Sequence, residues 1–136
     1  MFEMIEYRKL NSRQQENYNF QKIAARLADY GFNSIRLSND FEGADFIALH
    51  INGETLLRVQ LKGRLSFHAK YYGKDLHIAF RDGSDLYVYP HDELRKTIEE
   101  AGLLARSTSK AWVEHGSRSW PYIPKTLRPY LDQYKI

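Results

Sequence analysis

The sequence predicts an α/β (α+β) fold in which a mixed β-sheet lies between flanking helices, forming a three-layer core. Residues 12–30 have the residue spacing of an amphipathic helix, and residues 33–89 contain a series of short apolar strands separated by turn residues. Residues 92–101 form a second helical stretch. Strands in the middle and helices at both ends are typical of a sheet that is covered by helices.

Length and composition predict a single globular domain of a soluble protein. The chain has 136 residues, of which 43% are hydrophobic and 27% are charged, so we expect a single domain over residues 1–136, with residues 103–136 as its extension. No segment approaches the roughly 18 apolar residues of a membrane span, and Met1–Leu10 lacks the apolar region of a signal peptide. The absence of cysteine excludes disulfides and thiolate metal sites. We therefore expect a cytoplasmic protein with no membrane partner.

The first helix should begin near Ser12, which forms a capping-box pattern with Gln15, and should end before Gly31. Its buried stripe follows the i, i+3, i+4, i+7 rule and consists of Phe20, Ile23, Ala24 and Leu27. Glu16 lies one helical turn before this stripe and should face the same way.

Three strands should follow. Residues 33–38 predict the first strand and residues 39–43 a loop, whereas the apolar run of residues 45–51 is typical of a strand that is covered on both faces. In residues 54–63, apolar and polar side chains alternate, so that one face of this strand should be core. The turn pair Asn52-Gly53 predicts a hairpin between the second and third strands.

The rest of the chain predicts shorter elements. Residues 65–72 should be a loop or a ragged strand, and residues 76–80 and 86–89 should pair through the turn at 82–84. A helix should cover residues 92–101. The tail contains a short segment around residues 111–113 and a last helix near residues 127–133, whose start is limited by Pro129.

The predicted hairpin brings together three groups that can bind a metal and a phosphate. It folds Asp45 back beside Gln60 and Lys62, and residues two apart on a strand project from the same face. Mg²⁺ prefers hard oxygen ligands, and the Asp45 carboxylate, the Gln60 side-chain oxygen and the Leu61 carbonyl are all of this kind. Lys62 supplies a compact positive charge that suits a phosphate.

This order of elements resembles the PD-(D/E)XK nuclease superfamily, which includes restriction endonucleases, Holliday junction resolvases and some homing endonucleases. The resemblance covers roughly residues 12–90 and implies a restriction-endonuclease-like core that cleaves DNA with Mg²⁺ or Mn²⁺. It implies that Asp45, Gln60, Lys62 and Glu16 are catalytic and that Asp45, Gln60 and Leu61 bind the metal. Gln60 stands in place of the second acid, which removes one negative charge, and Glu16 would restore it.

Several other polar residues are candidate site residues. Asp40 and Glu42, in the loop before Asp45, are expected to be solvated loop residues more often than accessory metal ligands. His68 could line a DNA groove, although a surface position is slightly favoured, and His91 is expected to be a turn residue ahead of the second helix.

Positive charge is concentrated in the tail. Residues 1–102 carry 14 Lys and Arg against 15 Asp and Glu, whereas residues 103–136 carry 6 against 2. This asymmetry indicates either a surface that faces a polyanion or a solvated basic surface. Arg106 and four further basic residues alternate with Trp112, Trp120, Tyr122 and Tyr130, which would stack on bases or belong to the core or a dimer contact. The residues predicted to contact DNA are Arg64, Lys110, Arg118, Lys125 and Arg128.

Three functions are compatible with these features. The first is a metal-dependent DNA endonuclease, which would work as a homodimer if it cuts both strands. The second is a catalytically inactive nucleic-acid-binding protein with the same fold, because Gln60 would weaken metal binding. The third is a protein-interaction subunit whose tail aromatics form the interface.

Overall fold

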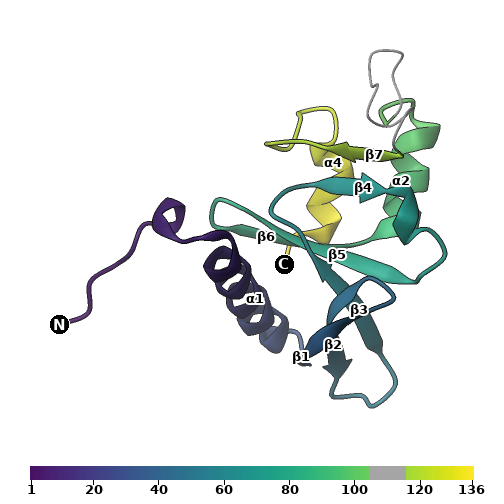
Figure 1. Ribbon diagram of the computed structural model, residues 1–136. Coiled ribbons are helices and arrows are strands. Elements are labelled where there is room, and N and C mark those ends of the chain that lie inside the picture. Colours follow the sequence, from purple (N-terminus) through teal and green to yellow (C-terminus); the bar gives the residue numbers. More distant parts are fainter. Residues whose placement is uncertain (105–115) are drawn as a thin grey trace.

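The computed structural model describes residues 1–104 and 116–136. Five strands form the main sheet in the order β1-β2-β3-β5-β6 (Figure 1). They are β1 (Phe32–Phe41), β2 (Ala44–His50), β3 (Leu56–Leu61), β5 (Leu76–Asp82) and β6 (Asp85–Pro90). β3 and β5 are parallel and the other neighbours are antiparallel, so the sheet is mixed, as the sequence predicts. β4 (Ser66–His68) and β7 (Ser117–Ser119) form a separate two-stranded sheet.

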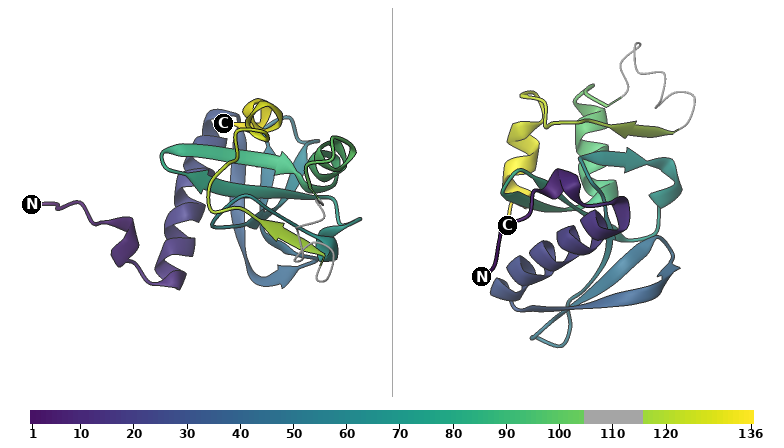
Figure 2. Two further views of the ribbon diagram at one scale, coloured as in Figure 1. Left: turned by 90° about the horizontal axis from the view of Figure 1, so that it is seen from above. Right: turned by 60° about the vertical axis from the view of Figure 1, so that its left-hand side comes forward.

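Helices cover both faces of the main sheet, which confirms the three layers. The long helix α1 (Ser12–Asp29) lies on one side, and α2 (His91–Glu100) and α4 (Arg128–Leu131) lie on the other (Figures 1 and 2). Short 3₁₀ helices precede α1, follow β4 and end the chain: η1 (Tyr7–Lys9), η2 (Ala69–Tyr71) and η3 (Asp132–Tyr134). Two buried apolar clusters hold the layers together, one under α1 and one under α2 and α4.

The first helix has the predicted length, but its cap lies one residue earlier than predicted. The Asn11 side chain accepts from the Gln14 N–H at 2.9 Å, and the Gln14 side chain accepts from the Asn11 N–H at 2.9 Å. Asn caps as well as Ser does, and both pairs have the same spacing of three, so the pattern alone did not separate them. The end is confirmed, because Gly31 adopts a φ of +86° that favours glycine.

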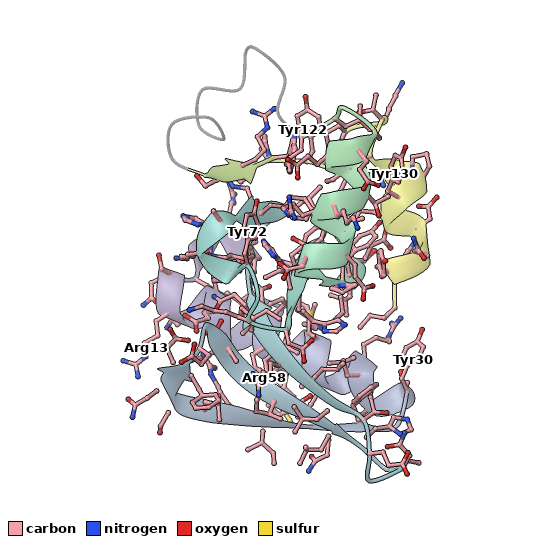
Figure 3. The ribbon with its side chains drawn as sticks, turned by 90° about the vertical axis from the view of Figure 1, so that its right-hand side faces the viewer. Arg13, Tyr30, Arg58, Tyr72, Tyr122 and Tyr130 are labelled. Carbon is pink, nitrogen blue, oxygen red and sulfur yellow. The ribbon has the colours of Figure 1, made fainter. Side chains whose placement is uncertain are left out.

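The first two strands differ from their predicted bounds and burial. β1 continues to Phe41, which pairs with Ala44, so a tight turn at Glu42-Gly43 replaces the predicted loop over residues 39–43. β2 is not covered on both faces, because Leu49 is 37% exposed. The helices α2 and α4 pack on the face of the sheet opposite α1, but they cover only part of that face. The uncovered part carries Arg58 (Figure 3).

The predicted hairpin between β2 and β3 is confirmed, and it sets the register of the site. The Asn52 side-chain oxygen accepts from the Glu54 N–H at 2.8 Å and from the Thr55 N–H at 2.9 Å, which closes the turn. Phe46 pairs with Val59 across the two strands. This register places Asp45 next to Gln60.

The C-terminal residues pack against the sheet instead of forming a separate tail. Trp120, Leu127 and Leu131 are buried in the cluster under α2 and α4. The predicted last helix is present as α4 followed by η3. The segment around residues 111–113 lies outside the described residues. Across residues 1–104 and 116–136, no helix combines the length and apolar character that crossing a membrane requires.

Candidate active site

A pocket of 290 Å³ lies between the start of α1, the start of β2 and the end of β3. Its lining includes Glu16 from α1, Asp45 from β2, and Gln60, Leu61 and Lys62 at the end of β3. Lys62 follows the last residue of β3, and its N–H donates to the Ala79 carbonyl of β5 at 2.9 Å. The sheet therefore holds the backbone of all three motif residues, and the structure brings all the predicted catalytic and metal-binding residues to one pocket.

Asp45 occupies an electrostatically unfavourable position for a lone carboxylate. Its Oδ2 accepts from the Leu61 N–H at 2.8 Å. Burial raises the pKa of Asp45, and the negative charges of Glu16 and Asp40 raise it further. The hydrogen bond from Leu61 acts in the opposite direction. A cation bound in the pocket would reverse this effect, because a positive charge favours the ionised carboxylate.

Gln60 and Glu16 each have a protein partner. Gln60 Nε2 donates to the Leu61 carbonyl at 3.2 Å, so one lone pair of this predicted ligand is in use. Glu16 Oε1 accepts from Arg36 Nη2 at 2.9 Å, so the Glu16 carboxylate forms an ion pair with an arginine of β1.

The donors fit a hard cation. Asp45 and Glu16 are carboxylates, and Gln60 and Leu61 supply neutral oxygens, which agrees with the one or two carboxylates plus water that hold Mg²⁺ in proteins. Among the described residues, no group of three or more His, Cys, Asp or Glu side chains is placed to hold a metal ion. A metal here would therefore depend on neutral oxygens, water and substrate.

Lys62 stands between two pockets. Its ammonium lies 5.3 Å from the centre of the Tyr71 ring, and Lys70 Nζ lies 5.1 Å from the same centre. Lys62 also lines a second pocket of 420 Å³, together with Arg64 and Arg118. One lysine side chain is thus adjacent to both an acidic and a basic environment.

The other residues predicted to contact DNA are dispersed. Arg128 Nη2 lies 3.6 Å from Asp82 Oδ2, so Arg128 forms an ion pair at the end of β5. Lys125 is exposed in the segment that leads into α4, and it lines neither of the two pockets that share Lys62. Lys110 lies outside the described residues. The roles of all these residues stay predictions.

A polar network that was not predicted from the sequence borders the pocket of Glu16 and Asp45, which we call the acidic pocket. Asn19 is buried within α1; its Nδ2 donates to the Tyr7 hydroxyl at 2.9 Å, and its Oδ1 accepts from Arg81 Nε at 3.0 Å. This network fastens the segment before α1 to β5. The sequence contains one signal for the burial of Asn19, a repeat of four residues. This repeat extends the buried stripe of α1 towards its N-terminus through Leu27, Ile23, Asn19 and Gln15.

The interpretation of His91 as a turn residue is wrong. His91 is the first residue of α2 and is only 1% exposed. Its Nε2 accepts from the His68 N–H at 3.1 Å, so the neutral ring carries its proton on Nδ1, which lies 2.8 Å from Asp92 Oδ1. Burial lowers the pKa of His91, although Asp92 opposes this. His91 therefore fastens β4 to α2, a role that depends on a contact between distant segments.

Comparison with known proteins gives a likeness in structure only. No protein-family model matches the chain, and no curated protein matches it by sequence. The structure is similar to that of a bacterial homing endonuclease, with a TM-score of 0.52 and 16% identity over 92% of this chain and 86% of that one. It is also similar to Hjc, a Holliday junction resolvase from the archaeal hyperthermophile Archaeoglobus fulgidus, with a TM-score of 0.54 and 16% identity over 86% of this chain and 89% of that one. The chain therefore shares the fold of these two proteins, the restriction-endonuclease-like three-layer core that the sequence predicts.

Proposed function

We propose that the protein is a DNA endonuclease that hydrolyses phosphodiester bonds with the help of Mg²⁺ or Mn²⁺. The observation that carries this proposal is the meeting of Glu16, Asp45, Gln60 and Lys62 in one pocket. The fold adds support, since it is shared with a homing endonuclease and a Holliday junction resolvase.

Each group in the pocket has a distinct task under this proposal. Asp45, the Gln60 side-chain oxygen and the Leu61 carbonyl would hold the metal, and Glu16 would add negative charge. The metal, when bound, supplies Lewis acidity at the phosphate. Lys62 holds the scissile phosphate, orients the attacking water and stabilises the charge that develops in the transition state.

A plasmid-nicking assay with Mg²⁺ or Mn²⁺ tests the proposal. Asp45→Asn and Lys62→Gln should each lower the nicking rate about 100-fold or more, as the loss of one transition-state contact does in other enzymes. Arg26→Gln is the matched control, because Arg26 is exposed on α1 and lines neither pocket, and it should nick like the wild type. Nicking that persists in both site variants would refute the proposal.

A second function, DNA binding without cleavage, is favoured by Gln60. Its amide donates to the Leu61 carbonyl, and no second acid occupies the motif position. Titration calorimetry separates the two functions: the endonuclease should bind Mg²⁺ with a heat that Asp45→Asn abolishes. A protein that binds DNA but shows no such heat would be the inactive form.

The proposed endonuclease requires two copies to cut both strands at one place, since residues 1–104 and 116–136 of one chain form one such pocket. The bare face of β1–β3 supports a homodimer, because it exposes apolar side chains that a second copy can cover: Ile35 at 47%, Leu49 at 37% and Leu56 at 48%. Light scattering should give twice the chain mass, and Leu49→Lys should give a monomer. A wild-type monomer at all concentrations would exclude this arrangement.

A further inference from the structure

The basic pocket beside Lys62 has a lining that suits an anion. Its lining residues include Lys62, Arg64, Ser66, His68, Ser117 and Arg118, and none of the described residues that line it is acidic. Its volume is 420 Å³, and it shares Lys62 and Gly63 with the acidic pocket. The two pockets therefore adjoin each other at the end of β3.

The two-stranded sheet determines which side chains share a face here. β4 and β7 are antiparallel, with Ser66 opposite Ser119 and His68 opposite Ser117. These four residues thus share one face and supply hydroxyl groups and an imidazole. Arg118 pairs with Phe67 and therefore belongs to the other face of this small sheet, although it also lines the pocket. Phe67, between Ser66 and His68, is buried in the core, where its ring meets the Trp120 ring edge-on at 6.1 Å between centroids. The polar face is therefore carried on a well-anchored support.

Two polar atoms of this pocket's residues lack partners. Ser66 Oγ and Arg118 Nε are buried, and neither has a hydrogen-bond partner within residues 1–104 and 116–136. The Arg118 guanidinium lies 5.0 Å from the centre of the Trp120 ring. Buried donors without partners are costly. Because both atoms are buried, an anion in the pocket would accept from them only after a movement of these side chains, and such hydrogen bonds would offset the cost.

His68 also presents a donor within a positive environment. Its Nδ1 accepts from the Lys70 N–H at 3.0 Å, so the neutral ring carries its proton on Nε2. Burial lowers the pKa of His68, and the charges of Lys70 and Lys62 lower it further. The same positive charges that disfavour an imidazolium favour a bound anion.

We propose that the pocket formed by Arg64, Ser66, His68 and Arg118 binds a second DNA phosphate, the one adjoining the scissile phosphate on the same strand. This inference rests on the proposed function for the identity of the ligand. The pocket would set the position of the strand, since a phosphate seated here brings its neighbour to Lys62 at the shared edge. Arg64, Ser66, His68 and Arg118 are positioning residues in this scheme.

The first test uses inorganic phosphate and needs neither metal nor DNA. Nuclear magnetic resonance of histidine side chains measures the pKa of His68 with phosphate and with chloride at equal ionic strength. Phosphate should raise the pKa of His68 and leave that of His77, on β5, unchanged. Arg118→Gln and Arg64→Gln should each reduce the shift, whereas the control Arg26→Gln should retain it. Equal shifts at both histidines, or no shift, would overturn the proposal.

The second test locates the phosphate on DNA, with EDTA present so that no cleavage occurs. Neutral methylphosphonates replace the phosphates one at a time in a DNA that the protein binds, and affinity is measured by fluorescence anisotropy. One replacement should weaken wild-type binding about tenfold, as the loss of a charged hydrogen bond does, and should have little further effect in Arg118→Gln. Additive effects at every position would contradict the proposal.

The two proposals fail in different ways. If the protein never nicks DNA but shows the His68 shift and the single coupled phosphate, the phosphate site stands and the nuclease function is refuted. If nicking depends on Asp45 and Lys62 but neither phosphate signal is seen, the nuclease function stands and the phosphate site is refuted.

Discussion

The two pockets that meet at Lys62 differ in charge and in how the chain builds them. The acidic pocket takes its residues from the first half of the chain, from Tyr7 to Gly63, whereas the basic pocket needs β7 as well. Carboxylates gather in the first, and Arg, His and Ser gather in the second. Under the two proposals, a single lysine between the pockets suits a phosphodiester strand, because a metal site on one side and an anion site on the other would act on neighbouring phosphates.

Substitution of the shared residue should have the largest effect on this comparison. Lys62→Gln should lower cleavage about 100-fold or more and should also weaken DNA binding in EDTA, because Lys62 faces both pockets. Asp45→Asn should lower cleavage as much but should not weaken binding in EDTA, because it removes a negative charge. Anisotropy and nicking assays on the same preparations check this; equal loss of binding in both variants would contradict the division between the pockets.

Restoring the missing acid should sharpen the acidic pocket alone. Gln60→Glu places a second carboxylate beside Asp45, so Mg²⁺ affinity in calorimetry should rise about tenfold, which corresponds to about 1.4 kcal/mol. Phosphate binding at His68 should not change. The same substitution made together with Asp45→Asn is the control, and it should lose most of the gain. An unchanged Mg²⁺ affinity in Gln60→Glu would show that Gln60 does not face the metal.

Acid should destabilise the framework of the basic pocket. Burial lowers the pKa of both His91 and His77 from 6.5, so the unfolded chain binds protons more readily than the folded one. The two histidines should therefore leave the free energy of unfolding unaffected above pH 6.5. As the pH drops below 6.5 towards the folded pKa values, this free energy should fall by at most about 1.4 kcal/mol per pH unit for each histidine. Thermal unfolding against pH measures this, and the slope should be smaller in His91→Gln. A flat profile would contradict it.

The smallest effect should be a gain in stability at the acidic pocket. The pKa of Asp45 is raised, so the ionised carboxyl costs stability once the pH exceeds its ordinary value of 3.8, and the cost is complete above the folded pKa. Asp45→Asn removes this charge and keeps an acceptor for the Leu61 N–H. We expect the free energy of unfolding at pH 7 to rise by about 1 kcal/mol or less. Chemical denaturation measures it, and a clear loss of stability would contradict the unfavourable position assigned to Asp45.

Local patterns were sufficient for much of the acidic pocket. Asn52-Gly53 predicted the hairpin, and the alternation in β3 predicted its buried face, which together place Asp45 beside Gln60. Helical spacing correctly placed Glu16 beside the pocket, but its side chain is half exposed and pairs with Arg36, so it does not extend the buried stripe as predicted. The N-cap of α1 was predicted one residue too late, because Asn11 and Ser12 both fit the capping pattern. The turn at Glu42-Gly43 was predicted as a longer loop, because the polar residues of an exposed strand have the composition of a loop.

Contacts between distant segments could not be predicted. Ser66 pairs with Ser119, and no local pattern in either segment specifies the other. The burial of His91 requires β4 to pass over the start of α2, and the pairing of Arg128 with Asp82 separates it from Arg118 although both belong to the same basic tail. Residues that appear equivalent in the sequence thus have different surroundings.

The sequence alone determined the hairpin of β2 and β3 and the motif residues of the acidic pocket, because backbone turns and the two-residue repeat of a strand act over a few positions. Only the tertiary structure decided that Lys62 has a second, basic neighbour, because the pairing of β4 with β7 joins segments whose contact is stabilised by the buried Phe67 and Trp120. Burial of that kind depends on the whole packed core and has no local signature in the chain.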